Sequence, residues 1–479
     1  MTIRVAEVLN AEGITNGDRV ALLLADSPEF IAAFVAVIAL GAIAVPINLA
    51  LRPEEQLFIL QDCGARAAIV ERGVSEVFAK AELPHSLKIL LTVRGGASEP
   101  FRGLQSIPLE EAPRQPIAGV SSLNSNSDAF ILYTSGSTGQ PKGAVHSQAD
   151  VFYTNDTYCR EVLHLREGDR LFSSSRLPFA YGLGNSLTFP LLNGHTAILC
   201  REKPTPEVVG RIFKHARPTI FFGVPVVFRM LLEHQRNVAP LDVSSLRLCI
   251  SAGEALPAHL GQDWQDTVGV EVLDGIGSTE MLHMFMSNHS GEARYGSSGK
   301  LLNGYEARLI DHQGKATAAG EEGNLWIRGG SAASRYWQRP AITSETFVDD
   351  WVRTGDLYRC DADGFWWHMG RSDDCFKPTG QWVSPIEVES VLLKHQDVRA
   401  AAVVEGFDDT QLSCVCAFIV SAADTEKLES ELRSACKEAL PRFKQPRRYF
   451  FVTELPYTAT GKVQRFKLRD QLRSQRASV

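Results

Sequence analysis

The chain has 479 residues, a formal net charge of −7 and a pI near 6.0. This length exceeds what one hydrophobic core normally serves, so we expect at least two domains. The acidic balance argues against a nucleic-acid-binding surface. The nine cysteines show no Cys-x-x-Cys pair and no zinc-ligand spacing, which favours a reducing, cytoplasmic setting.

No stretch of the sequence predicts a membrane segment. The longest apolar run, residues 30–45, is shorter than the ~20 residues that a bilayer-spanning helix needs, and it reads as a helix running into a strand. Residues 1–7 lack the uninterrupted apolar segment of a secretory signal. We therefore expect no membrane partner.

The first part of the chain alternates strand patterns with helix patterns. The predicted strands are residues 19–24, 42–46 and 67–70, and the predicted helices are residues 28–40 and 53–62. This alternation is typical of right-handed βαβ units on a mostly parallel sheet, which predicts an α/β fold. Residues 94–126 are rich in Gly, Ser, Pro and charge, and they read as an irregular connection.

A segment rich in glycine and hydroxyl groups, residues 133–143, follows the apolar strand pattern of residues 129–132. Glycines let backbone N–H groups turn inward, and such concave loops bind phosphate oxygens. Lys142 adds a point charge that can follow a departing phosphate. The segment is not a Walker A motif, because Lys142 is followed by Gly143. A phosphate-binding loop is favoured over a flexible surface linker.

Four later segments combine a strand pattern with candidate site residues. They are residues 171–174 before the aromatic stretch 176–186, residues 218–225, residues 246–257 with a turn at 251–254, and residues 272–283. The aromatic stretch is either a pocket wall or a set of loop anchors, and the turn is either a ligand contact or an ordinary βα turn. His283 is either a core residue or a pocket residue, one helical turn from Thr279 if a helix begins there.

The pattern changes after residue 299. Residues 305–310 and 323–329 predict antiparallel strands of a small β-subdomain, at about 299–372. The polar residues 370–374 predict a boundary, so we assign residues 1–372 to an N-terminal domain and residues 373–479 to a C-terminal lid. Within the lid, helices at 385–394 and 425–440 and strands at 398–404 and 414–420 predict a compact α+β domain.

In order, and over residues 17–475, these segments resemble the adenylate-forming superfamily of acyl- and aryl-CoA ligases, peptide-synthetase adenylation domains and luciferases. The strings that carry the resemblance are TSGSTGQPKG (134–143), GIGSTE (275–280), RTGD (353–356), GRSDD (370–374) and TGK (460–462). The strings PFAYGLGN (178–185) and EMLH (280–283) resemble the benzoate-CoA ligase branch in particular.

The resemblance implies a role for individual residues. Lys462 bridges the acid carboxylate and the α-phosphate of ATP, Thr279 contacts that phosphate, and Glu280 holds Mg²⁺, while Lys142 is the lysine of the phosphate loop. The implied ATP- and AMP-binding residues are Thr134, Ser135, Gly136, Ser137, Thr138, Gly139, Ser251, Ala252, Gly253, Glu254, Asp274, Gly275, Ile276, Gly277, Asp356 and Arg371. The implied substrate pocket is Phe179, Ala180, Tyr181, Gly182, Val224, Gly277 and His283. Asp373 is the implied hinge of the lid, and Gly380 lies at the implied thiol tunnel.

The implied reaction is activation of benzoate or a substituted benzoate with ATP and Mg²⁺, followed by transfer to coenzyme A. One alternative is a stand-alone ligase that loads an aryl acid onto an acyl-carrier protein; CoA-dependent release of AMP separates the two. The other alternative is a nucleotide- or acyl-binding protein without turnover, which an absence of pyrophosphate exchange with every aryl acid would favour.

Overall fold

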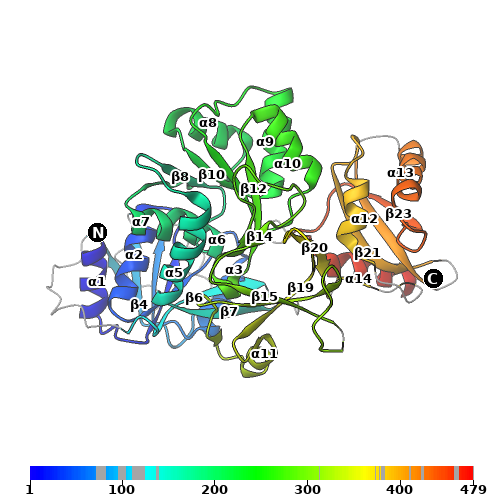
Figure 1. Ribbon diagram of the computed structural model, residues 1–479. Helices are drawn as coiled ribbons and strands as arrows, with labels where there is room; N and C mark the ends of the chain where they lie inside the picture. Colours follow the sequence, from blue (N-terminus) through cyan, green and yellow to red (C-terminus); the bar gives the residue numbers. More distant parts are fainter. Residues whose placement is uncertain are drawn as a thin grey trace. The chain divides into compact units, whose positions relative to one another are not determined.

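The computed structural model describes residues 1–71, 82–94, 104–110, 124–135, 140–311, 313–372, 374–376, 378, 383–408, 412–421, 425–457 and 463–477. The chain forms two compact units (Figure 1). The first unit comprises Met1–Leu256, Leu260–Glu306 and Ile327–Arg353, and the second comprises Pro257–His259, Ala307–Trp326 and Thr354–Val479. The domain boundary predicted at residue 373 falls on a residue outside the described part and stays a prediction. Among the described residues, no helix has both the length and the apolar character to cross a membrane.

The first unit contains an eight-stranded sheet with the strand order β17-β7-β6-β2-β1-β3-β4-β5. Its strands are β1 (Arg19–Leu23), β2 (Ile43–Pro46), β3 (Ala67–Glu71), β4 (Ile89–Val93), β5 (Gln105–Pro108), β6 (Asp128–Ser135), β7 (Pro141–Ser147) and β17 (Arg335–Tyr336). Strand β1 pairs in parallel with β2 and β3, as the sequence predicts for βαβ units. The irregular connection predicted at 94–126 is wrong in part, because β5 adds a parallel edge strand beside β4. Four residues amid Gly, Ser and Pro are too few to give a strand signal.

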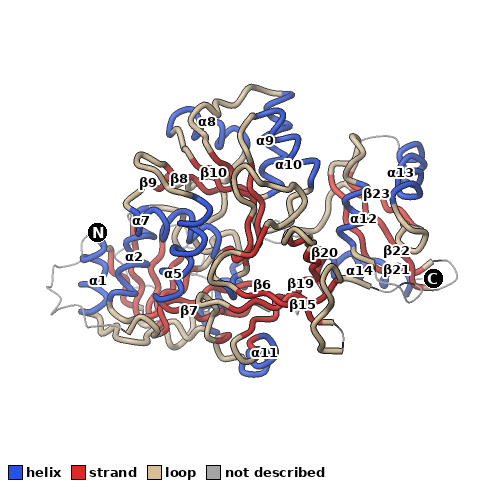
Figure 2. The backbone as a smooth tube through the Cα atoms, viewed as in Figure 1, coloured by secondary structure: helices blue, strands red, loops and turns tan. Residues whose placement is uncertain are grey.

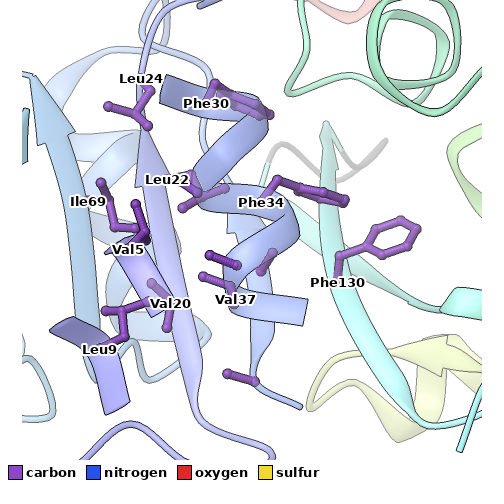
Figure 3. Close-up of a cluster of buried hydrophobic side chains, with 14 of the residues drawn as sticks. Val5, Leu9, Val20, Leu22, Leu24, Phe30, Phe34, Val37, Ile69 and Phe130 are labelled. Atoms are coloured by element: carbon purple, nitrogen blue, oxygen red, sulfur yellow. The ribbon is translucent and has the colours of Figure 1, made fainter. Parts of the chain in front are cut away.

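Helices α1 (Thr2–Ala11), α2 (Pro28–Ala39) and α3 (Pro53–Asp62) accompany this sheet. Figure 3 shows α1 and α2 packing their apolar faces onto it. Val5 and Leu9 of α1 and Phe30 and Phe34 of α2 are at most 2% exposed, in one cluster with Leu22 of β1. Full burial of a side chain of this kind contributes about 1.5–3 kcal/mol. The cluster therefore holds helices α1 and α2 against the sheet and fixes the positions of its strands.

Three helices begin with the same local signal, a hydroxyl residue followed by proline. Ser27, Thr205 and Ser384 accept a hydrogen bond from the backbone N–H three residues on. Proline at the first helical position has no N–H to leave unsatisfied, so the signal both starts and caps the helix. The helices that follow are α2, α8 (Pro206–Ala216) and α12 (Pro385–Leu392).

A second sheet of the first unit has the order β14-β13-β12-β11-β10-β8-β9. Its strands are β8 (Arg170–Ser173), β9 (Thr196–Ile198), β10 (Ile220–Gly223), β11 (Leu248–Ser251), β12 (Val272–Gly277), β13 (Met284–Ser287) and β14 (Lys300–Leu301). Helices α8, α9 (Pro225–Asn237) and α10 (Ala258–Val268) pack against it (Figure 1). Phe221, Phe228 and Trp264 are buried together in this layer, with ring centroids 4.8–5.5 Å apart.

Helical segments flank this sheet where the sequence predicts no helix (Figure 2). They are α5 (Gln148–Thr154), the π-helix η1 (Asn155–Leu163), α6 (Ala180–Leu183), the π-helix η2 (Gly184–Thr188) and α7 (Phe189–Asn193). The aromatic stretch 176–186 is thus largely helical rather than a loop. Its glycines give it low helix propensity, and buried contacts override that preference. π-Helical turns are rare and occur frequently at functional sites.

A third sheet has the order β15-β16-β19-β18, with β20 on β19. Its strands are β15 (Glu306–Ile310), β16 (Glu322–Arg328), β18 (Phe347–Val348), β19 (Trp351–Cys360) and β20 (Trp366–Arg371), and α11 (Pro340–Thr346) precedes β18. Strands β18 and β20 pair antiparallel with β19. The sequence predicts this small β-region correctly.

The second unit also contains the predicted α+β region. Its three-stranded sheet consists of β21 (Ala400–Phe407), β22 (Ser413–Val420) and β23 (Arg448–Val452), accompanied by α12, α13 (Thr425–Ala439) and α14 (Arg465–Ala477). Cys414 and Cys416 are both buried in β22. Strand β23 and helix α14 were not predicted. Charged residues are frequent in α14, whereas β23 is a short, mostly aromatic segment that follows the basic residue Arg447.

Asp26 is a buried carboxylate that follows β1. Its Oδ1 accepts a hydrogen bond from the backbone N–H of Leu177 at 3.2 Å, and Oδ2 lies 3.9 Å from Arg176 Nη1. Burial raises the pKa of Asp26 from 3.8 to about 6, against the opposing attraction of Arg176. The carboxylate therefore costs stability once it ionises in the folded protein.

We predict that Asp26→Asn stabilises the protein at neutral pH but much less in acid. Because the folded pKa lies above the unfolded value, the stability linked to protonation is present below pH 3.8 and is lost as the pH rises through about 6. The free energy of unfolding of the variant, relative to that of the wild type, should rise by about 2 kcal/mol when the pH is raised from 4.5 to 7.5, as measured by urea unfolding. Asp156→Asn, whose parent side chain is 57% exposed, is the control. If the stability difference between Asp26→Asn and the wild type does not change with pH, the raised pKa assigned to Asp26 is contradicted.

Candidate active site

Strands β6 and β7 form an antiparallel pair that carries both ends of the predicted phosphate loop (Figure 2). Thr134 pairs with Lys142 in register, and Ser135 pairs with Pro141. Gly143 is required here, since a Cβ atom would lie 2.5 Å from the Ile131 side chain. The predicted phosphate contacts Gly136, Ser137, Thr138 and Gly139 lie outside the described residues.

Lys142 and Glu280 are joined through the hydroxyl group of Tyr336. Lys142 Nζ donates to Tyr336 Oη at 2.6 Å, and Tyr336 Oη donates to Glu280 Oε1 at 2.5 Å. The direct distance from Lys142 Nζ to Glu280 Oε1 is 3.8 Å. Tyr336 is 1% exposed, whereas the lysine and glutamate side chains are 22% and 17% exposed. The Lys142 ammonium and the Glu280 carboxylate, both partly exposed in the first unit, are therefore bridged by the hydroxyl group of a buried tyrosine.

Thr279 follows β12 in a short 3-10 turn, Thr279–Met281. The helix considered for this position is absent: the turn lasts three residues, and β13 begins at Met284. The Thr279 carbonyl lies 2.8 Å from His146 Nε2, and His146 Nδ1 lies 2.7 Å from Asp150 Oδ2. Since a carbonyl oxygen only accepts, Nε2 carries a proton. His146 therefore ties the turn to β7.

His283 lies in a cage of aromatic rings. The centroid of its imidazole is 4.7 Å from Tyr158, 4.7 Å from Phe189 and 5.7 Å from Tyr181. Burial lowers the pKa of His283 to about 3. Among the described residues, neither ring nitrogen has a hydrogen-bond partner. The neutral imidazole of His283 therefore has one ring nitrogen that can donate and one that can accept a hydrogen bond, and both are available.

Glycines allow this close packing. A Cβ atom on Gly184 would lie 2.4 Å from His283 Cδ2, and one on Gly277 would lie 2.4 Å from the His283 carbonyl oxygen. A Cβ atom on Gly182 would lie 2.0 Å from the carbonyl oxygen of Arg176. The remaining predicted pocket residues lie around this region: Phe179 precedes α6, Ala180 is buried in it, and Val224 packs on the core beside β10.

The predicted adenine-contacting residues meet at the ends of β11 and β12. Ser251 and Asp274 are register partners in these parallel strands, and both are buried. Asp274 Oδ2 accepts from the Leu256 N–H at 3.2 Å, while Oδ1 has no partner among the described residues. Burial raises the pKa of Asp274 to about 8. Gly253, between Ala252 and Glu254, has φ +94°, a conformation that favours glycine.

Gly275 and Ile276 continue β12 toward Thr279. A Cβ atom on Gly275 would lie 2.6 Å from the Met286 carbonyl oxygen of β13, so glycine lets the two strands approach. The predicted nucleotide and pocket residues of the first unit that the structure describes thus cluster around β6, β7, β11 and β12.

Within the second unit, Asp356 and Arg371 face each other as register partners of β19 and β20. Arg371 Nη1 lies 3.2 Å from Asp356 Oδ1, and His368 Nε2 lies 3.4 Å from the same oxygen. Gly355 has φ +75°, and a Cβ atom there would lie 2.8 Å from the Arg371 guanidinium. The structure thus brings together the two residues predicted to bind ribose. Asp373, Gly380 and Lys462 lie outside the described residues.

Comparison with known proteins agrees with this geometry. Residues 2–337 match the family described as AMP-binding enzyme, and residues 387–462 match the AMP-binding enzyme C-terminal domain. The chain belongs to the AMP-binding enzyme family. It is therefore an AMP-forming ligase of the adenylate-forming type that the sequence motifs resemble.

Individual members of the AMP-binding enzyme family are similar over nearly the whole chain. A benzoate–CoA ligase of Thauera aromatica is 42% identical, covering 95% of this chain and 86% of that protein. The crystal structure of an anthranilate CoA ligase in complex with anthranoyl-AMP has 39% identity and a TM-score of 0.93, covering 99% of this chain and 91% of that one. A benzoate CoA ligase from Burkholderia xenovorans LB400 has 38% identity and a TM-score of 0.88, covering 98% and 92%.

AMP-binding enzymes of this type use ATP with Mg²⁺, and the residues here fit that ion. The described residues contain no group of three or more His, Cys, Asp and Glu side chains placed to hold a metal. Mg²⁺ needs no such cage, since it is usually held by one or two carboxylates together with substrate phosphates and waters. Glu280, partly exposed beside Lys142, suits that role.

Three residues around the site were not predicted from sequence: His146, Tyr158 and Tyr336. Gly184 lies in the predicted aromatic stretch 176–186 but was not named as a pocket residue. The spacing of His146 and Asp150, four residues apart across the capping residue Ser147, could have revealed the first. Nothing local distinguishes Tyr336, which lies 194 residues after Lys142.

We predict that His283 stays neutral in the folded enzyme down to pH 5. Its folded pKa, about 3, lies below the usual 6.5, so the stability that the neutral ring contributes is present above pH 6.5 and is lost as the pH falls toward 3. Two-bond ¹H–¹⁵N NMR of histidine-labelled protein measures this, with His283→Gln for assignment. A His283 resonance that titrates between pH 5.5 and 7.5 contradicts the predicted burial.

Proposed function

We propose that the enzyme activates an aryl carboxylic acid, benzoate or a substituted benzoate, as aryl-AMP and then transfers the aryl group to coenzyme A. The observation that carries this proposal is the pairing of two unlike sites within the first unit. The charged group of Lys142, Thr279 and Glu280 lies at one end of β12, and the aromatic cage of His283 follows three residues after Glu280. The charged group suits a nucleotide phosphate, and the cage suits a flat, uncharged ring.

In the first step, a carboxylate oxygen attacks the α-phosphorus of ATP. The bond from that phosphorus to the bridging oxygen of pyrophosphate breaks, and pyrophosphate leaves. Because two anions must meet, catalysis depends on positioning and on neutralising phosphate charge. Lys142 supplies one positive charge, and Glu280 holds Mg²⁺, which when bound neutralises phosphate oxygens. Thr279 contacts the α-phosphate, and Lys462 bridges it to the carboxylate.

In the second step, the thiol of coenzyme A attacks the acyl carbon, its proton is lost, and AMP leaves. The lid turns about Asp373, which withdraws Lys462 and brings Gly380 to the thiol tunnel. Asp356 and Arg371 hold the ribose hydroxyls; the ion pair between them orients the carboxylate as an acceptor. The turn from Ser251 to Glu254 and the strand from Asp274 to Gly277 hold the adenine ring.

The aryl ring lies against Tyr181 and His283, with Phe179, Ala180, Gly182, Val224 and Gly277 completing the pocket. A neutral imidazole fits this role because a charged one would attract the carboxylate to the wrong end of the pocket. The relatives support an aromatic acid, since they are named for benzoate and anthranilate.

The second candidate acceptor is an acyl-carrier protein. One relative, a p-hydroxybenzoic acid–AMP ligase of Mycobacterium tuberculosis, is named for AMP and not for coenzyme A; it is 33% identical over 98% of this chain and 64% of that protein. Coenzyme A remains the proposed acceptor, because the benzoate and anthranilate ligases described above have higher identity to this chain and are CoA ligases. The nine free cysteines support a reducing cytoplasm as the site of action.

A panel of aryl and aliphatic acids tests the function. With MgATP and coenzyme A, we expect AMP release to be at least tenfold faster with benzoate or a monosubstituted benzoate than with hexanoate, because a flat ring suits a pocket wall made of aromatic rings such as Tyr181 and His283. Lys462→Ala is the matched variant: it should abolish adenylation and leave thioester formation from supplied aryl-AMP largely intact. ADP as the product, or a preference for the aliphatic acid, contradicts the proposal.

We also predict that Gly184→Ala weakens aryl acid binding without weakening ATP binding. The added methyl group overlaps the His283 ring and must displace it. We expect a KM for benzoate raised by tenfold or more and a KM for ATP changed less than threefold. Gly194→Ala is the control, since the structure has nothing within 4 Å of a Cβ atom at that glycine, although its φ of +70° carries its own strain. Equal effects of Gly184→Ala on both substrates would show that the cage does not hold the acid.

A further inference from the structure

We propose that Tyr336 is a positioning residue whose hydroxyl group orients Glu280 for the divalent cation that accompanies ATP. This inference rests on the proposed function for the identity of the nucleotide. It concerns a residue that belongs to none of the motifs singled out above.

The donor and acceptor roles around Tyr336 follow from the chemistry of its partners. The ammonium group of Lys142 can only donate, so the phenol oxygen accepts from it at 2.6 Å. The phenol proton is then available to the Glu280 carboxylate, which only accepts, at 2.5 Å. The hydroxyl group therefore polarises in one direction, from the lysine toward the glutamate.

Only one oxygen of Glu280 takes part in these contacts. Oε1 accepts from Tyr336 and is also the atom nearest to Lys142. Among the described residues, Oε2 makes no hydrogen bond. A carboxylate held by one oxygen presents the other in a fixed direction, and partners of this kind tune metal affinity at other sites by 10–100-fold.

The backbone around Tyr336 is held from several sides, so its hydroxyl position is fixed. Tyr336 pairs with Ala144 of β7, and the Trp337 N–H donates to the Gly143 carbonyl at 2.7 Å. Its ring packs edge-on against Phe347 at 5.3 Å. The Ala333 N–H donates to the Glu280 carbonyl at 2.7 Å. The segment from Ala333 to Trp337 is thus hydrogen-bonded both to strand β7, which carries Lys142, and to the turn that carries Glu280.

The Tyr336 hydroxyl group links Lys142 to Glu280. Opposite charges linked in this way keep the lysine from folding away and the carboxylate from turning outward. When the nucleotide and its cation are bound, the lysine can move to a phosphate oxygen while Tyr336 Oη continues to donate its hydrogen bond to Oε1. Tyr336 therefore matters most for the metal-dependent part of nucleotide binding.

Tyr336→Phe tests the proposal, because it removes the hydroxyl and keeps the ring that packs on Phe347. Isothermal calorimetry measures the Kd of ATP with excess EDTA and with saturating Mg²⁺. The ratio of these two Kd values is the gain in ATP affinity that the metal provides. We expect that gain to fall by about tenfold or more in the variant. Mn²⁺ binding to the enzyme–ATP complex, followed by electron paramagnetic resonance, should weaken by a similar factor.

Tyr305→Phe is the matched control. It removes another buried phenol hydroxyl, which pairs with Ser331 Oγ at 2.8 Å, and Ser331 donates to the Met281 carbonyl next to Glu280. A purely structural effect would lower thermal stability in both variants and leave the metal-dependent gain unchanged in both. An unchanged gain in Tyr336→Phe, or no gain in the wild type, overturns the proposal. If the metal strengthens ATP binding but no aryl acid yields pyrophosphate, the assignment of Tyr336 stands and the proposed function fails.

Discussion

The repulsion between a carboxylate and a triphosphate is the constraint that organises this protein. In water the two anions avoid each other, so an enzyme that joins them must hold positive charge where the phosphates lie. Lys142 provides that charge from β7, and Glu280 is placed to bring in a cation. Strands β7 and β17 pair with each other, and the turn after β12 that carries Glu280 is hydrogen-bonded to Ala333 just before β17, so three segments distant in sequence place these two groups. The cores around both sheets of the first unit keep those strands in register.

The surroundings of His283 follow the opposite rule, since charge is excluded there. Rings on three sides and glycine at the fourth leave the imidazole buried and neutral. Charged and uncharged regions follow one another within a few residues, from Glu280 to His283, because the chain makes a tight turn between β12 and β13. A short turn is therefore enough to separate the phosphate chemistry from the recognition of the acid.

Sequence patterns predicted what depends on local chemistry. The strands β1, β2 and β3 and the helices α2 and α3 follow from periodicity and capping, whereas the central residues of the glycine loop, 136–139, lie outside the described residues and stay a prediction. What they missed depends on contacts across the fold. Tyr336 gains its role only when β17 lies beside β7, and Gly184 only when His283 packs against it. The π-helical turns at Asn155–Leu163 and Gly184–Thr188 carry no local signal, since burial rather than propensity maintains them.

The central claim is that an oxygen of the acid attacks the α-phosphorus of ATP. Benzoate labelled with ¹⁸O in both carboxylate oxygens tests this directly, with MgATP, coenzyme A and mass spectrometry of the nucleotide product. The account predicts AMP that carries one ¹⁸O atom in its phosphate and a thioester that keeps the other. Unlabelled AMP with a doubly labelled acid, or ADP as the product, would contradict it.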